Sequence, residues 1–256
     1  MYFWYMTKTV LIGAGNLAFH FYKRLTNCNE VKVIQWYSRS LQKIDFAKKQ
    51  TEVIDQFSQI KSADLYLICV SDDAIGSMCK KINTSKLVVH CAGGVSIDQL
   101  EGTPRKGVFY PLQTFSKDQD LSFDQLPFCI ETTDPKDQIL LSNIAKAMGG
   151  IPYKVDSKTR AQMHMIAVLI NNFGNHLLYL GSKLLNEHDI PFEIFHPLIK
   201  ETYQKALKSG PENTQTGPAI RDDQKTIEKH LGLLSDENIK KLYLNLTTSI
   251  QRNHEQ

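Results

Sequence analysis

A short apolar run followed by closely spaced glycines stands near the start of the sequence, and its residue types favour binding of phosphate groups. Residues 10–12 lead into Gly13, Ala14, Gly15, Asn16, Leu17 and Ala18, with the spacing G-x-G-x-x-A. The first glycine permits a tight turn, the second lets the backbone approach a pyrophosphate, and the alanine lets the next helix pack closely on the strand. The positive end of that helix then stabilises the phosphates. The segment therefore predicts a dinucleotide-binding loop at residues 13–17.

The residues after the second predicted strand indicate which dinucleotide is bound. They are Ser38, Arg39 and Ser40, without the Asp or Glu that usually binds the ribose hydroxyls of NAD. An arginine between two hydroxyl groups binds a 2′-phosphate through charge-assisted hydrogen bonds. We therefore predict NADP (NADPH) as the cofactor, the alternative being that Arg39 is a solvated surface charge. The missing acid also argues against methyl transfer from S-adenosylmethionine, which expects a carboxylate on the ribose.

Two later strand ends add candidates, because open α/β sheets bind ligands at the carboxyl ends of their strands. Val70 and Ser71 end the fourth predicted strand and complete the predicted cofactor site, although a helix cap at Ser71 or Asp72 is the plainer alternative. His90 ends the fifth strand, and Gly93 with its glycine neighbour leaves room for a nicotinamide ring. We predict a catalytic role for His90, with a buried structural histidine as the alternative.

Amide side chains interrupt an apolar helical stretch at residues 163–185. His164, Asn171 and Asn175 share one face at α-helical spacing, and Asn172 lies on the adjacent stripe. Amides are costly to bury without a partner or ligand. We predict Asn171 and Asn175 as catalytic residues and His164 and Asn172 as substrate ligands. The alternative is that the amides pair with a neighbouring helix or with a second subunit.

Two further residues are candidates for substrate binding. Arg221 lies in a loop with glycine and proline before a helix, where its guanidinium can bind a carboxylate or phosphate, unless it pairs with Asp222 or Asp223. Tyr110 ends the sixth predicted strand and is expected to line the cleft. The five cysteines never form a CxxC pair, so neither a metal site nor a disulfide framework is predicted.

The elements that position these residues follow an α/β pattern and then an all-helical one. Strands are predicted at 9–12, 31–36, 52–54, 65–70, 87–91, 108–110, 128–131 and 153–155, and helices at 158–186, 192–208, 223–234 and 236–252. We predict an N-terminal Rossmann-type doubly wound parallel sheet, residues 1–156, that binds NADP. A helical domain for substrate binding and dimerisation, residues 157–256, follows.

Composition limits the classes of partner. The chain has 256 residues, 42% hydrophobic and 22% charged, with a net charge of +3, which excludes disordered or collagen-like proteins and favours a small-molecule substrate over nucleic acid or membrane. Unpaired cysteines favour a cytoplasmic protein. The apolar segment before Thr7 is too short for a signal peptide, and whether translation begins at Met1 or Met6 stays open.

Several segments together resemble a known family. They are 12–18, 88–94, 107–115, 171–176 and 216–223, and they are similar to Rossmann-like proteins with a C-terminal domain of unknown function, DUF2520, often labelled NADP oxidoreductases. The resemblance covers nearly the whole chain. It implies the fold of pyrroline-5-carboxylate reductase and the 6-phosphogluconate dehydrogenase superfamily, an NADP cofactor and a homodimer. Relatives often have glycine where this chain has Asp222.

Together these patterns favour an NADP-dependent oxidoreductase that transfers hydride to or from a small polar C=O or C=N substrate held between the domains. The alternative is a dinucleotide-binding regulatory or scaffold protein without turnover, because no residue is an obvious general acid. The resemblance implies no particular substrate.

Overall fold

The computed structural model describes residues 6–254 of the chain. Residues 1–5, on which the question of the translation start depends, lie outside this range. The chain separates into two compact units, residues 1–176 and 177–256. The change from strands to helices lies at the predicted boundary near Asp156, whereas the division between compact units lies inside the long helical stretch that follows.

The first unit is built on one sheet, and all of the predicted strands are present with slightly different ends. In chain order they are β1 (Thr7–Ile12), β2 (Val31–Tyr37), β3 (Glu52–Ile54), β4 (Leu65–Ile68), β5 (Leu87–His90), β6 (Arg105–Pro111), β7 (Pro127–Thr132) and β8 (Ile151–Lys154). Their order in space is β3-β2-β1-β4-β5-β6-β7-β8. The order turns between β1 and β4, which places ligand sites at the carboxyl ends of these strands.

One pairing differs from the predicted parallel sheet. β7 runs antiparallel to β6, while the pairs from β3 to β6 and the pair of β7 with β8 are parallel. An antiparallel strand added at one side of a parallel sheet is common, and hydrophobicity does not reveal strand direction. The carboxyl ends of β1, β2, β4, β5 and β6 still meet at one edge, so the site described below is unaffected.

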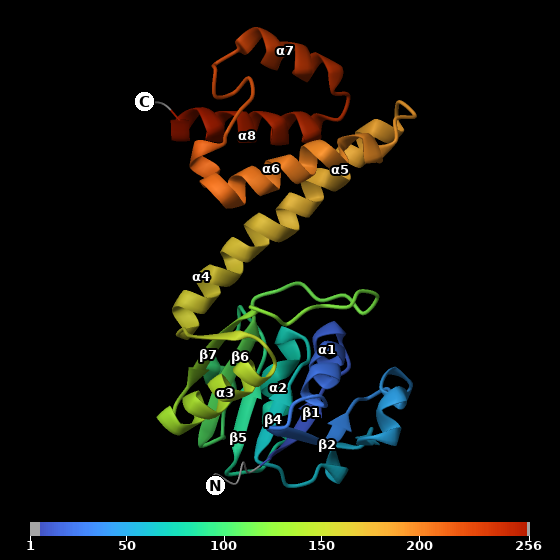
Figure 1. Cartoon of the computed structure of the whole chain (residues 1–256), viewed down its shortest axis with the longest axis vertical. Coiled ribbons are helices and arrows are strands. Elements are labelled where there is room, and N and C mark those ends of the chain that lie inside the picture. Colours follow the sequence, from blue (N-terminus) through green and yellow to red (C-terminus); the bar gives the residue numbers. More distant parts are fainter. Residues whose placement is uncertain (1–5, 255–256) are drawn as a thin grey trace. The chain divides into compact units, whose positions relative to one another are not determined.

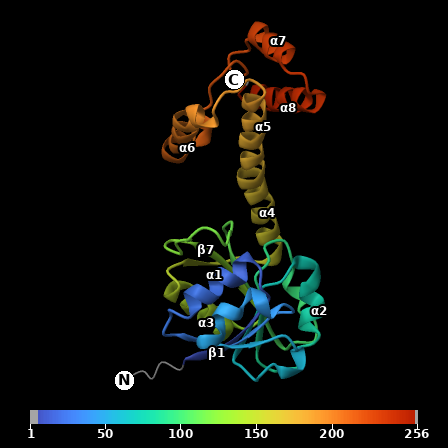
Figure 2. The same cartoon turned by 90° about the vertical axis from the view of Figure 1, so that its right-hand side faces the viewer.

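Helices cover both faces of the sheet (Figures 1 and 2). On one face, α1 (Asn16–Leu25) and α3 (Pro135–Ala147) pack on alternate strand residues such as Leu11 and Leu67. On the other face, α2 (Ile75–Cys79) packs on residues such as Val10 and Ile68. Because side chains alternate between faces along a strand, these nearly continuous apolar strands are buried on both sides.

The predicted helical stretches are all present after β8. They are α4 (Ser157–Ala167) with the π-helical segment Val168–Phe173 and α5 (Gly174–Asn186), then α6 (His196–Ser209), α7 (Gln224–Leu233) and α8 (Glu237–His254). Gly210 ends α6 with a φ of +83°, and the Asp236 carboxylate accepts the first backbone N–H bonds of α8. A glycine at the carboxyl end and an aspartate at the amino end are the residue types expected at helix termini.

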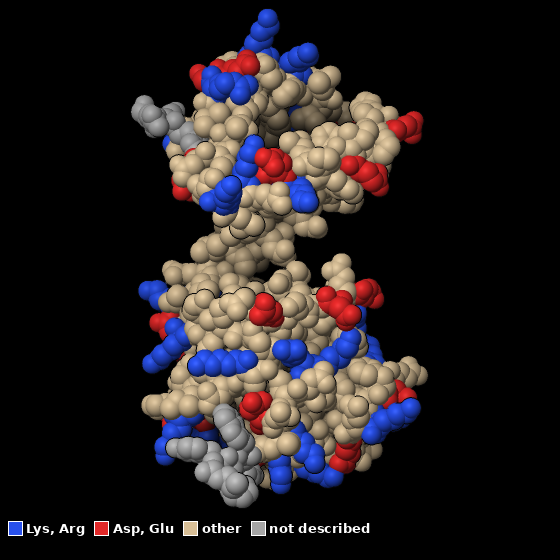
Figure 3. Space-filling model, in the orientation of Figure 1, with Lys and Arg blue, Asp and Glu red and all other residues tan. Residues whose placement is uncertain are grey.

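Charge distribution and helix composition bear on binding to a polyanion or a membrane. On the face seen in Figure 3, basic and acidic side chains are interspersed. Within residues 6–254, no helix combines the length and the apolar content needed to cross a bilayer.

Candidate active site

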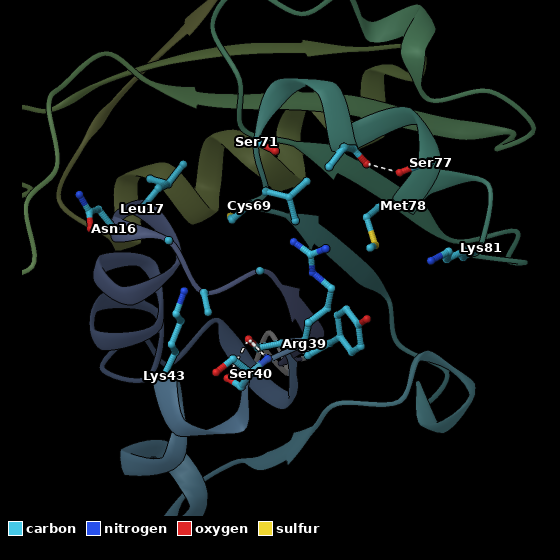
Figure 4. A pocket seen from close by; sticks show the side chains of 17 residues that line it. Asn16, Leu17, Arg39, Ser40, Lys43, Cys69, Ser71, Ser77, Met78 and Lys81 are labelled. Carbon is cyan, nitrogen blue, oxygen red and sulfur yellow. Dashed lines mark hydrogen bonds between the residues drawn. The ribbon is translucent and has the colours of Figure 1, made fainter.

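A cavity of about 680 Å³ opens at the carboxyl ends of β1, β2 and β4. All ten residues predicted to bind the cofactor line it: Gly13, Ala14, Gly15, Asn16, Leu17, Ser38, Arg39, Ser40, Val70 and Ser71 (Figure 4). The prediction missed seven others: Tyr37, Lys43, Cys69, Ala74, Ser77, Met78 and Lys81. These come from segments without a recognisable motif, so only the fold shows that they belong to the cavity.

The two glycines of the loop have different tasks. Gly13 has a φ of +114°, and a Cβ there would lie 2.1 Å from the Cys69 carbonyl oxygen, so only glycine fits this turn. The turn is held by the buried indole of Trp36, whose Nε1 donates a hydrogen bond to the Gly13 carbonyl at 2.6 Å. A Cβ on Gly15 would meet no heavy atom within 4 Å. Gly15 therefore leaves open space next to the start of α1, as a bound pyrophosphate requires.

Three cationic side chains and no acidic one line this cavity. Arg39 extends into it from the end of β2, and Lys43 and Lys81 lie on different sides of it (Figure 4). Among residues 6–254, none of the three makes an ion pair. Arg39 thus has no ion-pair partner within the described residues, and the cavity has a surplus of positive charge suited to an anionic ligand.

The serines near these cations differ in what they can do. Ser38 is buried, and its Oγ donates to the Ser40 carbonyl at 3.0 Å and accepts the Ser40 N–H at 3.1 Å. This hydroxyl therefore shapes the loop. Ser71 stands at the predicted N-cap position of a short helical turn, but its side chain makes no capping hydrogen bond there. The turn closes instead through a backbone bond from Ala74 N–H to the Ser71 carbonyl, at 2.9 Å.

The segment after β6 contacts the glycine loop and also contributes to a second cavity. The Asn16 side chain donates to the Phe115 carbonyl at 2.8 Å, and the Lys117 ammonium donates to the Ala14 carbonyl at 3.2 Å. Thr114, directly before Phe115, lines the second cavity. The first and second cavities thus share one connecting segment at the same edge of the sheet.

The second cavity has a volume of about 450 Å³ and lies between the end of β6 and the helical residues after Arg160. Its lining residues are Tyr110, Leu112, Gln113, Thr114, His164, Ala167, Val168, Ile170, Asn171 and Asn172. The Tyr110 hydroxyl lies 3.3 Å from His164 Nδ1. Four predicted substrate or catalytic residues, Tyr110, His164, Asn171 and Asn172, therefore meet here.

The π-helical segment decides which amides reach this cavity. A π-turn has more residues per turn than an α-helix, so residues beyond it are rotated relative to α-helical spacing. Asn171 and Asn172 both line the cavity with His164, and the Asn171 amide donates to the Asn172 side-chain oxygen at 3.2 Å. Asn175, which α-helical spacing placed on the face of His164, is exposed and is not among the lining residues.

Gly93 determines how closely Tyr110 and His164 approach each other. A Cβ on Gly93 would lie 2.6 Å from Tyr110 Cζ and 2.7 Å from His164 Nδ1. The space beside Gly93 is therefore filled by these two side chains and not left free for a nicotinamide ring. At Gly94 the nearest atom would be His164 Cδ2, at 3.4 Å, an ordinary contact.

His90 ends β5, between the strands that line the two cavities, but its side chain is fully buried and lines neither. Its Nδ1 accepts the Ala92 N–H at 3.2 Å, and its Nε2 has no partner within the described residues. Burial, and next the positive charge of Arg160, lower the pKa of His90 to about 4. The imidazole is therefore neutral at physiological pH.

A buried arginine fastens the start of α4 to the sheet. The Arg160 guanidinium is fully buried, forms an ion pair with Glu131, and donates to the Val95 carbonyl at 2.6 Å and to Ser157 Oγ at 3.0 Å. His164 follows one helical turn later, so this anchor holds its ring beside Tyr110. The sequence contains no signal for this role, because Arg160 resembles any charged residue in a first helical turn.

Arg221 belongs to the second compact unit, where it is exposed. The alternative ion pair with Asp222 or Asp223 is absent from the described residues. Asp222 has a φ of +50°, the left-handed conformation that glycine adopts easily, and its carboxylate accepts bonds from Gln224 at 2.7 Å and Gln251 at 2.8 Å. The loop thus keeps a glycine-like conformation with an aspartate in place.

Comparisons with known proteins agree with this architecture. The family described as domain of unknown function DUF2520 matches residues 126–250. A solved structure described as a "putative NADP oxidoreductase" from Bacteroides fragilis is 35% identical, with 96% of this chain and 98% of that chain covered and a TM-score of 0.86. A protein from Thermotoga maritima is 21% identical, with coverages of 96% and 98% and a TM-score of 0.74.

More distant solved structures share the fold. A pyrroline carboxylate reductase from Plasmodium falciparum, solved with NADP bound, is 17% identical, with coverages of 97% and 98% and a TM-score of 0.59. The comparison with curated proteins finds no match. The likeness to the Bacteroides protein extends over both units at substantial identity. The chain therefore belongs to the family of Rossmann-like proteins with a C-terminal DUF2520 domain.

Proposed function

We propose that this protein is an NADP(H)-dependent oxidoreductase that transfers hydride between the nicotinamide and a small polar substrate with a C=O or C=N bond. The relative from Bacteroides fragilis is described as a "putative NADP oxidoreductase", and solved structures of the same fold include a pyrroline carboxylate reductase and an imine reductase. The fold and the class of cofactor follow from these likenesses. The kind of acceptor is our inference from the second cavity.

The observation that carries the proposal is the pairing of two dissimilar cavities at one sheet edge. The first has a glycine loop with open space at Gly15 and a surplus of three cations, which suits the pyrophosphate and the 2′-phosphate of NADP(H). The second has amides, hydroxyls and an imidazole among apolar side chains, which suits a small polar molecule. Cofactor and acceptor thus have separate sites linked through the Asn16 contact with Phe115.

Each group has a task in this proposal. When bound, NADPH supplies the hydride. Arg39, Lys43 and Lys81 bind its phosphates, and Asn171 and Asn172 orient the acceptor by hydrogen bonds. We keep Arg221 as a proposed ligand for an anionic group on the substrate. Asn175 and His90, predicted from the sequence as catalytic, have no task in this proposal, because neither lines either cavity.

We further propose that the protein is a homodimer formed through the α4 helix and its π-helical continuation. Within the first compact unit these segments expose five large apolar side chains: Met165, Ile166, Leu169, Ile170 and Phe173. A run of this kind marks an interface more often than free surface. Light scattering at micromolar concentration should give twice the chain mass, and Phe173→Asp should halve it; a monomeric wild-type mass contradicts this part of the proposal.

Turnover is tested by NADPH oxidation with a panel of small ketones, aldehydes, keto acids and cyclic imines. We expect at least one acceptor to raise the rate of absorbance loss at least tenfold above the rate without acceptor. Binding of NADPH is measured separately by its fluorescence. Tight binding without oxidation by any acceptor favours the alternative of a regulatory protein that holds the dinucleotide without turnover.

A further inference from the structure

We propose that Tyr110 is the general acid of the reaction and that His164 returns a proton to it. The inference rests on the proposed function, since it assigns a residue to the acceptor half of that reaction. Sequence patterns did not point to this pair as an acid, because the two residues are far apart in the chain and their proximity follows only from the fold.

The chemistry requires a donor at this place. Addition of hydride to a carbonyl carbon forms a C–H bond and breaks the C=O π bond, so an electron pair and a negative charge collect on the oxygen. In the proposed step the Tyr110 O–H bond breaks and its proton forms the O–H bond of the alcohol. This leaves a tyrosinate, and in the imidazolium form of His164 the Nδ1 proton moves to the tyrosinate oxygen, which restores the phenol and leaves a neutral imidazole. A proton from the solvent then restores the imidazolium.

The lining of the second cavity leaves few other donors. Its polar residues are Tyr110, His164, Gln113, Thr114, Asn171 and Asn172. Amides and an aliphatic hydroxyl form hydrogen bonds but are too weakly acidic to protonate a developing alkoxide, whereas a phenol and an imidazolium can do so. The distance of 3.3 Å between Tyr110 Oη and His164 Nδ1 allows transfer within the pair after slight tightening around a substrate.

The pair is also rigidly placed. Tyr110 lies near the end of β6, which pairs with β5 on one side and β7 on the other. His164 lies one turn after Arg160, whose buried guanidinium is bonded to Glu131 and to the Val95 carbonyl. Gly93 leaves room for the rings to meet, since any Cβ there would collide with both. A general acid must be held in a fixed position relative to the acceptor, and a tyrosine on the protein surface is not held in this way.

The environment of Tyr110 agrees with a protonated phenol. Burial raises the pKa of Tyr110, and the nearby Cys129 and Asp72 raise it further. The hydroxyl therefore keeps its proton until a charge develops on a bound acceptor.

The decisive experiment compares two acceptors that differ in their need for a proton. A ketone or aldehyde needs both hydride and proton, whereas a cyclic N-methyl iminium salt becomes a neutral amine through hydride alone. Tyr110→Phe should lower kcat at least tenfold on the best carbonyl acceptor and change kcat on the iminium salt less than twofold. Its Kd for NADPH should be unchanged. Tyr153→Phe, an exposed tyrosine on β8, is the matched control and should leave all three values unchanged.

Equal losses on both acceptors would overturn the acid role and leave Tyr110 as a positioning residue. An unchanged rate on the carbonyl would overturn the proposal altogether. These outcomes differ from failure of the proposed function, in which wild-type protein binds NADPH but reduces neither acceptor.

A second pair of variants tests the geometry without removing the phenol. Gly93→Ala should separate Tyr110 from His164 and reproduce the selective loss on the carbonyl acceptor, while Gly94→Ala should not. Circular dichroism and Tm establish that both variants fold. The ring ¹⁵N shifts of His164, measured without any substrate, should change in Tyr110→Phe and in Gly93→Ala; a His164 signal unaffected by either variant would overturn the pairing.

Discussion

The two cavities of the first compact unit are built in opposite ways. The first contains a recognisable glycine loop, residues 13–17, and the rest of its lining comes from residues 37–43 and 69–81, including three cationic side chains. The second is formed by side chains that come from β6 and from α4 with its π-helical continuation, more than fifty positions apart in the sequence, as the contact of Tyr110 with His164 shows. A dinucleotide is the same molecule in every enzyme that uses it, so part of its site can be recognised from a short motif. Substrates differ from one enzyme to the next, so a substrate site has no common sequence motif.

The variant with the largest expected effect tests whether the open space at Gly15 holds the pyrophosphate. Gly15→Val should weaken NADPH binding at least a thousandfold, about 4 kcal/mol, because the new side chain enters the space of the pyrophosphate. The Tm should stay within about 2 °C of the wild type, since a Cβ at Gly15 meets no protein atom within 4 Å. Fluorescence titration and thermal melting measure the two quantities.

Gly13→Val is the informative partner of this variant. Its side chain would collide with the Cys69 carbonyl, and the residue would keep an unfavourable φ of +114°. We expect loss of both Tm and NADPH binding, so the pair separates damage to the protein from damage to the ligand site. Normal binding by folded Gly15→Val would place the ligand elsewhere.

The second effect concerns His90, on the strand between the cavities. The unfolded chain binds a proton on this histidine near pH 6.5, whereas the folded chain does so only near pH 4. Between these values the unfolded state binds more protons, so the free energy of unfolding falls as the pH drops through this window and is constant for this group above it. The full difference corresponds to about 3 kcal/mol.

Urea unfolding at pH 4 to 7 measures this dependence. His90→Gln should remove that part of the slope, whereas His188→Gln, at an exposed position, should retain it. Identical slopes in wild type and His90→Gln would show that His90 is not held neutral by burial.

The third effect concerns the amide side chains of residues 171, 172 and 175, of which only the first two line the second cavity. Asn171→Ala and Asn172→Ala should each lower kcat/KM for an acceptor about tenfold, near 1.4 kcal/mol or somewhat more, with the Kd for NADPH unchanged. Asn175→Ala should change kcat/KM less than twofold, because the π-helical segment leaves Asn175 outside the cavity. An equal loss in Asn175→Ala would indicate that this residue reaches the substrate in the working enzyme.

The strands, the later helices and the cofactor cavity could be predicted from the sequence because their signals are local. Gly13 and Gly15 report a turn and an open space within a few residues, and apolar runs report strands that are buried on both faces. The antiparallel direction of β7 could not be predicted, because hydrophobicity is the same in both directions. Lys43 and Lys81 were missed since only the fold brings them to the cavity.

The second cavity could be predicted only in part. The amides among apolar residues indicated Asn171 and Asn172, but α-helical spacing grouped Asn175 with His164, and a π-turn overrides that spacing. Gly93 was recognised as unusual, but its real neighbours, Tyr110 and His164, follow from packing between β5, β6 and α4. Arg160 resembled a surface charge, and only its burial shows that it anchors the helix.

The smallest effect concerns the choice between NADPH and NADH, which depends on the cationic side chains that line the first cavity. Arg39→Ala should weaken NADPH binding about tenfold, 1.4 kcal/mol, and leave NADH binding unchanged, because we propose that the guanidinium binds the 2′-phosphate that NADH lacks. Lys43→Ala and Lys81→Ala should have smaller effects of the same sign, since an ammonium forms no bidentate pair. Lys80→Ala is the control, because Lys80 is adjacent in sequence but pairs with Glu101 and does not line the cavity. Each variant is titrated with both dinucleotides by fluorescence. Equal affinity of the wild type for NADPH and NADH would contradict the assignment of Arg39 to the 2′-phosphate. A loss of affinity for both dinucleotides in Arg39→Ala would indicate that Arg39 binds the pyrophosphate instead.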